Sequence, residues 1–230
     1  IGWSGLYPGT AACFSQLMER FRDRRQAGIR VAEELADKVD IGPSAVVLGI
    51  PRGGVVVADV VAREFDAELD VIAVEKLGSP WNPELAMGAV GEGEAMWIDA
   101  KVAEQVGASV LACTIEAERA ELVQKLADIR RIQPRIDLDG RTMIIVDDGV
   151  ATGSTVRAAL LALERAKPAR RILAVPVGSP ETLTELEEVA DVVVCPLRPP
   201  YFRAVGSWYE AFGQVSQAEV LEIFHQRKGT

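Results

Sequence analysis

The residues best suited to chemistry form one stretch, DDGVATGST, at positions 147–155. It follows the apolar, strand-type run 143–146 and precedes residues 156–166, whose composition and periodicity predict a helix. The backbone N–H groups of such a loop and helix N-terminus suit a phosphate, while two carboxylates suit ribose hydroxyls or a hydrated Mg²⁺ ion. The stretch therefore indicates a site for a phosphorylated sugar. The simpler alternative is a connecting loop in which Thr152 caps the helix and both acids are solvated.

This segment resembles the ribose-phosphate signature of the type I phosphoribosyltransferases: an apolar strand, two acids, three variable positions and Thr-Gly-x-Thr. In that family the ligand is 5-phosphoribosyl 1-pyrophosphate (PRPP). The resemblance implies that Asp147 and Asp148 face its 2- and 3-hydroxyls and hold Mg²⁺ indirectly, through ligand hydroxyls or water. The residues that would wrap the 5-phosphate are Gly149, Val150, Ala151, Thr152, Gly153, Ser154 and Thr155.

A second candidate is the turn PRGG at 51–54, which follows the apolar run 45–50, a predicted buried strand. Gly53 and Gly54 allow the backbone to approach a ligand closely, and Arg52 can bind pyrophosphate through two parallel hydrogen bonds. The turn resembles the pyrophosphate loop of purine phosphoribosyltransferases, which implies a strained or cis peptide between its first two residues. Alone, a Gly-Gly pair after a strand is more often only a turn.

Lys76 is the third candidate, and it stands just before a stretch rich in glycine and proline, residues 78–94. That composition predicts a mobile loop or flap. A lone lysine at a strand end is usually solvated, but in the family a basic residue at this point contacts pyrophosphate. The order of the motifs reproduces the family layout over residues 45–160.

One position departs from part of the family. Hypoxanthine-guanine enzymes have an aspartate immediately before the Thr-Gly pair, whereas this chain has Ala151. The loop is similar to that of adenine-type enzymes, in which an acid from the flap serves instead. The resemblance thus implies a catalytic role for Glu84 in the flap, together with Lys76 and Arg52. The alternative for Glu84 is a solvated loop residue.

Aromatic residues gather near the C-terminus, in the run YFRAVG at 201–206 and at Trp208 and Tyr209. They resemble the C-terminal hood of purine phosphoribosyltransferases, which implies that Phe202 lies over the acceptor base. The spacing differs by about one residue from that of the family, and Trp208 replaces an acid. The identity of the acceptor base is therefore left open. The alternative is an aromatic patch that covers the sheet edge or a dimer surface.

The elements that must position these residues alternate between helix and strand. The pattern predicts helices at 23–38, 55–65, 109–132, 156–167, 180–189 and 217–226, and strands at 45–50, 69–74, 95–98, 143–146, 171–177 and 191–197. Such alternation indicates an α/β fold with a mostly parallel sheet and helices on both faces, as in type I phosphoribosyltransferases. We divide the chain into an N-terminal extension of unknown role (1–18), a core (19–198) with a flap at about 78–94, and a C-terminal hood with a last helix (199–230).

Bulk composition excludes several classes of protein. The net charge is -9 and the cations are not clustered, which argues against a nucleic-acid partner. Three distant cysteines form no CxxC pair, and one histidine allows no obvious catalytic triad. No apolar run approaches the roughly 20 residues of a membrane span, and residues 1–18 do not resemble a secretory signal. We expect a cytoplasmic protein, and the resemblance implies a homodimer.

The expected function is therefore transfer of ribose 5-phosphate from PRPP to a nitrogenous, base-like acceptor with release of pyrophosphate, supported by Mg²⁺. The alternative is a non-catalytic sensor or regulator that binds PRPP or a nucleotide on the same fold. The sequence favours the enzyme, because such sensors usually carry a nucleic-acid-binding part and this acidic chain shows none.

Overall fold

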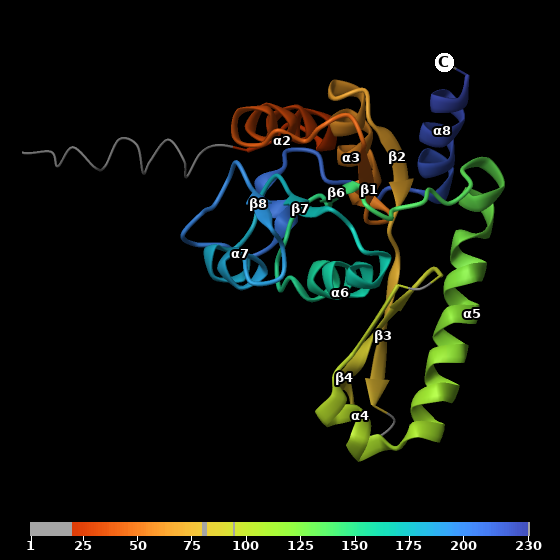
Figure 1. Ribbon diagram of the computed structural model, residues 1–230. Coiled ribbons are helices and arrows are strands. Elements are labelled where there is room, and N and C mark those ends of the chain that lie inside the picture. The colour runs from red at the N-terminus through yellow and green to blue at the C-terminus, as the bar shows by residue number, and fades with distance from the viewer. Residues whose placement is uncertain (1–19, 80–81, 94, 230) are drawn as a thin grey trace, which may run out of the picture.

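The main sheet has five strands in the order β2–β1–β6–β7–β8, and every pairing in it is parallel. The computed structural model describes residues 20–79, 82–93 and 95–229 (Figure 1). The strands are β1 (Ala45–Gly49), β2 (Glu68–Val71), β6 (Thr142–Val146), β7 (Arg170–Ala174) and β8 (Val192–Val194). The parallel sheet is thus confirmed, and β6, which leads into the two acids, is its central strand.

Helices cover both faces of this sheet (Figure 1). On one face lie α2 (Arg24–Lys38), α3 (Gly53–Glu64) and α8 (Gln217–Lys228); on the other lie α6 (Ser154–Leu163), extended by the turn η1 (Glu164–Ala166), and α7 (Pro180–Leu186). Successive side chains of a strand point to opposite faces, so Ile144 packs in the first layer and Met143 in the second. The expected helices on both faces are confirmed.

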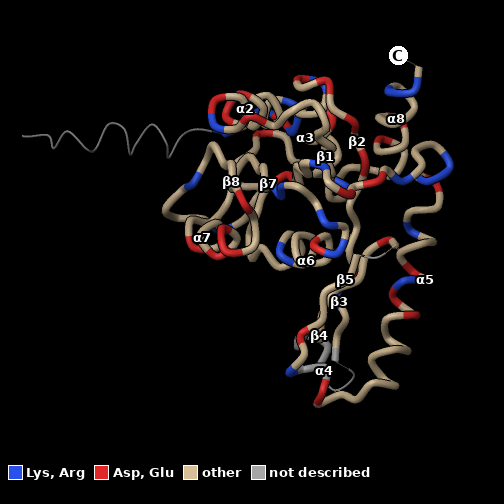
Figure 2. Tube along the Cα trace, in the orientation of Figure 1, with Lys and Arg blue, Asp and Glu red and all other residues tan. Residues whose placement is uncertain are grey.

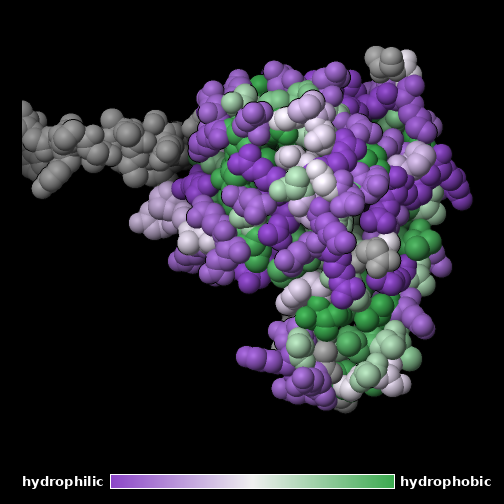
Figure 3. All heavy atoms as spheres, viewed as in Figure 1, coloured by the Kyte–Doolittle hydropathy of each residue, from purple (hydrophilic) through white to green (hydrophobic). Residues whose placement is uncertain are grey.

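A second sheet forms an arm beside the main sheet (Figure 1). Its antiparallel strands are β3 (Val74–Ser79), β4 (Asn82–Gly91) and β5 (Met96–Ile98), followed by α4 (Ala100–Val106) and α5 (Ala108–Ile132). The hairpin strands carry few charges (Figure 2), and hydrophobic residues gather over them (Figure 3). The buried residues Leu77, Met87 and Val90 form their own small core with Val106.

The arm corrects two expectations. Residues 78–94 were expected to be a loop, but β4 occupies most of that range, and the expected strand 69–74 is divided between β2 and β3 in different sheets. The glycines of the arm serve close strand pairing: a Cβ at Gly88 would lie 2.2 Å from the Trp97 carbonyl oxygen, and one at Gly91 would lie 2.9 Å from the Ala95 Cβ. Glycine content here therefore marks tight packing between strands instead of a loop.

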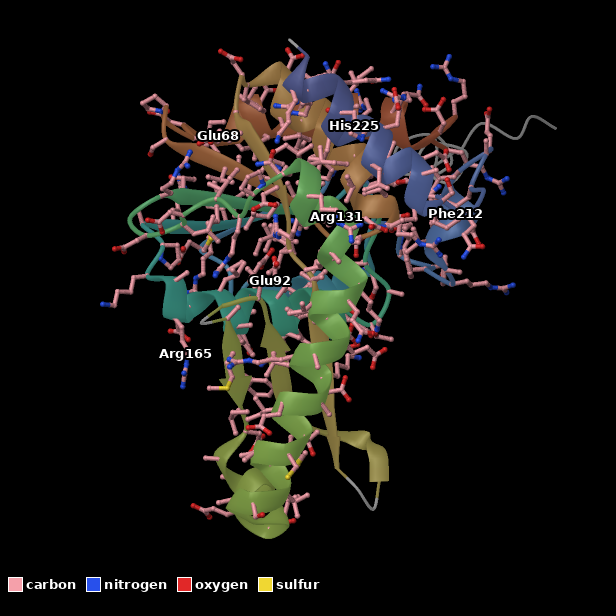
Figure 4. All side chains as sticks on the ribbon, turned by 90° about the vertical axis from the view of Figure 1, so that its right-hand side faces the viewer. Glu68, Glu92, Arg131, Arg165, Phe212 and His225 are labelled. Carbon is pink, nitrogen blue, oxygen red and sulfur yellow. The ribbon has the colours of Figure 1, made fainter. Side chains whose placement is uncertain are left out.

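An ion-pair network attaches the arm to the body. Arg130 of α5 donates to Asp70 at 2.6 Å and to Glu92 at 2.8 Å, and Asp70 is only 2% exposed. Figure 4 shows Glu92 beside α5. Glu92, one of the acids at the end of the arm hairpin, is therefore engaged in holding the arm and is not available for a ligand.

The C-terminal aromatic residues form a separate cluster at the carboxyl ends of the strands. Trp208, at the end of the turn η2 (Val205–Trp208), and Tyr209 are buried with Phe21 and Val177. These two aromatics therefore belong to the core, and the partly buried Phe202 packs against their cluster. Within the described residues, no helix is both long and apolar enough to cross a bilayer. The extension 1–18 lies outside the described part of the chain.

Candidate functional site at the carboxyl end of the sheet

Two acids follow directly after the central strand, and two neighbouring segments contact the second of them. Asp148 Oδ2 accepts a hydrogen bond from Arg24 Nε at 2.7 Å, and the Asp148 carbonyl accepts one from the Tyr209 hydroxyl at 2.6 Å. The Asp148 amide in turn donates to Asp147 Oδ1 at 2.8 Å. The acids thus lie where ligands bind in parallel α/β sheets, and contacts from α2 and the C-terminal segment fix the position of Asp148.

The two carboxyl groups differ in their electrostatic surroundings. Burial, and next the neighbouring charge of Asp148, raise the pKa of Asp147 to about 8. Burial also raises the pKa of Asp148, but the hydrogen bond and charge of Arg24 oppose that rise. Asp147 is therefore mostly protonated at neutral pH in the free protein, whereas Asp148 has a cationic partner that favours its ionised form.

We predict a specific pH dependence of stability from Asp147. Its pKa is about 8 in the folded protein against an ordinary value of 3.8, so unfolding releases a proton between these values. The free energy of unfolding should then fall as pH rises from about 4 to about 8, by at most about 1.4 kcal/mol per pH unit. Denaturant unfolding of the wild type and Asp147→Asn between about pH 5 and about pH 8 measures this difference. Parallel curves for the two proteins would contradict the assigned pKa.

The loop after the acids presents unoccupied backbone donors. Among the described residues, none accepts a hydrogen bond from the amides of Ala151, Thr152, Gly153, Ser154 or Thr155. Gly153, in left-handed conformation with φ of 69°, is the N-cap of α6 and gives no side-chain cap. Thr152 therefore does not cap the helix, as the alternative interpretation of this loop required. Free amides at a helix start form a suitable cradle for phosphate.

One member of the predicted loop is engaged elsewhere. The Val150 amide donates to the Val177 carbonyl at 2.8 Å, which continues the sheet by one bridge. Val150 is also buried. Its amide is therefore not among the free donors of the loop.

Lys76 reaches the cradle from the arm. Its Nζ donates to Ser154 Oγ at 2.7 Å, and Ser154 Oγ lies 3.1 Å from Thr152 Oγ1. The sequence pattern placed Lys76 at the end of a strand of the main sheet, but the side chain comes from β3 of the second sheet. An exposed ammonium group beside free amides adds positive charge where a phosphorylated ligand would bind.

Replacing Lys76 should weaken binding without loss of stability. We expect Lys76→Met to lower the affinity for PRPP by about tenfold, because a hydrogen bond to a charged group contributes about 1.5–3 kcal/mol. The free energy of unfolding should change by less than about 0.5 kcal/mol, since the side chain is exposed. Calorimetry with Lys101→Met, an exposed lysine on α4, as the control tests this. Equal losses in both variants would remove Lys76 from the site.

The PRGG turn packs directly against the acids. A Cβ at Gly53 would lie 2.0 Å from Asp148 Oδ2, and one at Gly54 would lie 2.7 Å from the Val146 carbonyl oxygen. The peptide bond between Pro51 and Arg52 is cis, as the sequence analysis expected. The two glycines thus let the start of α3 approach the end of β6, so the PRGG turn and the acids lie in direct contact.

The turn and the cradle border the same cavity of about 440 Å³. Arg52 and Thr155 line it, with apolar Ile50 and the ion pair between Lys125 and Glu75 at 2.8 Å. The Arg52 guanidinium is exposed and forms no ion pair or hydrogen bond with another described residue. A free cation therefore lies at the edge of a cavity that is continuous with the loop.

Two predicted residues are not brought to the acids by any contact of the described chain. Phe202 lines a different cavity, of about 520 Å³, together with Glu181 and Arg203. Glu84 belongs to β4 by its backbone, but its side chain lies outside the described part of the structure. Their roles at the acceptor stay predictions.

The donor atoms around the acids fit a metal ion held mainly by its ligand. Within the described residues, no group of three or more histidine, cysteine, aspartate or glutamate side chains could hold a metal ion. Asp147 and Asp148 remain, and Arg24 already occupies one oxygen of Asp148. Since Mg²⁺ prefers six oxygen ligands, most of them would come from pyrophosphate or water. The indirect role expected for both acids is compatible with this arrangement.

Three residues of the site were missed by the sequence analysis. They are Arg24 and Tyr209, which contact Asp148, and Thr182, whose hydroxyl donates to the Ala151 carbonyl at 2.8 Å. Arg24 lies 124 positions before Asp148. Its only sequence signal was its place in a short basic run at the start of a helix, which gave no indication of its partner.

Comparison with known proteins defines the class. Residues 19–210 match the family model described as phosphoribosyl transferase domain, so the chain belongs to this family. The protein TT1426 from Thermus thermophilus, for which a crystal structure is known, is 44% identical to this chain in sequence. The two structures superpose with a TM-score of 0.81, and the match covers 90% of this chain and 98% of that chain. The type I phosphoribosyltransferase fold is thereby confirmed.

Two curated relatives come from Mycobacterium tuberculosis, and both bear the name "Putative phosphoribosyl transferase". Each is 40% identical over 206 residues, which are 89% of this chain but 46% of the relative. The chain thus spans about half the length of the curated relatives that it matches.

Proposed function

We propose that this chain transfers ribose 5-phosphate from PRPP to a nitrogenous, base-like acceptor and releases pyrophosphate. One observation carries the proposal: the loop 147–155, with its two acids and free amides, meets Lys76 and the PRGG turn, both distant from it in sequence, at the carboxyl edge of one parallel sheet. This combination matches the parts of PRPP, which has a 5-phosphate, two ribose hydroxyls and a pyrophosphate.

Each group has a definite task in the proposed reaction. The amides of 151–155 bind the 5-phosphate, and Asp148 with Asp147 orients the ribose hydroxyls. Arg52 and Lys76 hold the pyrophosphate, which leaves with the electron pair of the anomeric C–O bond. The nitrogen lone pair of the acceptor then forms the new C–N bond. A bound Mg²⁺ ion supplies charge neutralisation to the leaving pyrophosphate.

The acceptor side of the reaction rests on Phe202 and Glu84, the two predicted residues that no described contact brings to the acids. Phe202 is proposed to stack on the acceptor, and Glu84 to take the proton that the acceptor nitrogen loses. Ala151 supports the second role because the loop itself offers no carboxylate at this point. The cytoplasmic location and the homodimer expected from the sequence stay predictions.

A binding screen tests the proposal. Thermal unfolding with PRPP and Mg²⁺ should show a higher Tm than with either alone, and the correct nucleobase should raise the Tm further. Release of pyrophosphate is measured on every combination that raises the Tm. Binding of PRPP without release of pyrophosphate for any base would favour the alternative, a non-catalytic sensor that binds PRPP. No response of the Tm to PRPP would reject both the transferase and the PRPP sensor.

A further inference from the structure

Arg24 connects one acid of the site to the C-terminal segment. Its Nε donates to Asp148 Oδ2 at 2.7 Å, and a second guanidinium nitrogen donates to the Gly213 carbonyl at 2.8 Å. The guanidinium also lies over the ring of Phe212, 4.0 Å from its centroid. Figure 4 shows Phe212 in the C-terminal segment. The arginine and aspartate side chains are only 11% and 16% exposed, so water screens their ion pair weakly.

The contact leaves half of the carboxylate free. Arg24 bonds to Oδ2 alone, and Oδ1 of Asp148 accepts no hydrogen bond from another described residue. Because the guanidinium donors are fixed in direction, the bond to Oδ2 restrains this oxygen and so limits rotation of the carboxylate. Asp148 is therefore held in one orientation with one acceptor atom available.

We propose that Arg24 is a positioning residue for the ribose of the donor, an inference that rests on the proposed function. Arg24 holds Asp148 by Oδ2 so that Oδ1 accepts a ribose hydroxyl. Arg24 also links the Asp148 carboxylate to Phe212 and Gly213, so that Asp148 and the C-terminal segment form one unit. Arg24 itself does not touch the donor in this arrangement.

The fold does not depend on Arg24 for attachment of the C-terminal segment. The Phe21 amide donates to the Trp208 carbonyl at 2.9 Å, the Glu210 amide to the Phe21 carbonyl at 2.8 Å, and the Ala211 amide to the Arg22 carbonyl at 3.0 Å. These backbone hydrogen bonds remain when the arginine side chain is removed. A change at Arg24 should therefore act on ligand binding more than on folding.

The test separates the ribose from the phosphate. Calorimetry measures binding of PRPP with Mg²⁺, and of inorganic phosphate, to the wild type, Arg24→Gln and Arg24→Lys. Arg24→Gln should bind PRPP at least about tenfold more weakly, while the affinity for inorganic phosphate stays the same. Arg24→Lys keeps a charge for Asp148 and should recover part of the lost affinity.

The matched control is Arg227→Gln. Arg227 likewise joins a buried carboxylate, Asp59, to a backbone carbonyl, at 3.3 Å and 2.7 Å, but it does so between α8 and α3. This variant should bind both ligands like the wild type. Thermal unfolding of all variants identifies any that do not fold. If Arg24→Gln does not fold, the affinities of Arg24→Lys for PRPP and for inorganic phosphate are compared in its place.

Two results would overturn the inference in different ways. If the wild type binds PRPP and Arg24→Gln binds it equally well, or loses phosphate affinity to the same degree, Arg24 has no positioning role. If the wild type binds phosphate but not PRPP, the proposed function fails first, and the positioning role fails with it.

Discussion

Replacing both Asp147 and Asp148 by asparagine is expected to weaken binding of PRPP by at least about a hundredfold and to leave binding of inorganic phosphate unchanged. Asp148 offers a charged acceptor to a ribose hydroxyl, which contributes about 1.5–3 kcal/mol, and Asp147 offers a second hydrogen bond. Inorganic phosphate needs only the free amides of 151–155, which the double variant keeps. Calorimetry with and without Mg²⁺ measures both affinities.

Variants that change one acid at a time, and calorimetry with and without Mg²⁺, provide the internal controls. Asparagine at 148 can still accept the hydrogen bond of Arg24, so the local structure should persist. Mg²⁺ should strengthen PRPP binding to the wild type and have little effect on the double variant. Equal PRPP affinity for wild type and double variant, whether Mg²⁺ is present or absent, would contradict the roles assigned to the acids.

The second large effect is expected for Gly54→Ala. The new Cβ would lie 2.7 Å from the Val146 carbonyl oxygen and 2.8 Å from Asp147 Cα, and both are backbone atoms that no side-chain rotation can move. Overpacking of this kind costs about 1–3 kcal/mol. Relief requires the PRGG turn to move away from the acids, so the variant should lose stability and PRPP binding together.

Gly229→Ala is the matched control for this prediction. A Cβ there would have its nearest neighbours at 3.9 Å, and the residue follows the last helix far along the chain from the site. Denaturant unfolding and PRPP calorimetry of both variants make the comparison. A Gly54→Ala protein as stable and as tightly binding as the control would show that the turn and the acids need not be in contact.

The parts of the site that lie in one continuous stretch could be predicted from the sequence. DDGVATGST and PRGG each combine a buried strand, a special loop and a helix start, so their residue types alone indicated the end of the sheet where they meet. Local spacing is sufficient when a strand positions the residues that follow it.

Features that depend on partners distant in sequence could not be predicted. The glycines of β4 predicted a loop. They in fact permit the close approach of β5, and a sequence does not show such an approach. Lys76 does lie beside the loop 147–155, but it comes from the second sheet and not from the main sheet. For the contact of Arg24 with Asp148, no periodicity or motif joins a helix start to an acid 124 positions later.

Identification of a reaction product would show directly whether the protein transfers ribose 5-phosphate from PRPP. The protein is incubated with PRPP, Mg²⁺ and single nucleobases or related nitrogenous rings, and the mixture is analysed by mass spectrometry. At least one acceptor should give a product with the mass of the acceptor plus ribose 5-phosphate less water, formed together with an equal amount of pyrophosphate. The Asp147→Asn, Asp148→Asn double variant should form none. Tight, Mg²⁺-dependent binding of PRPP with no such product from any acceptor would contradict catalysis.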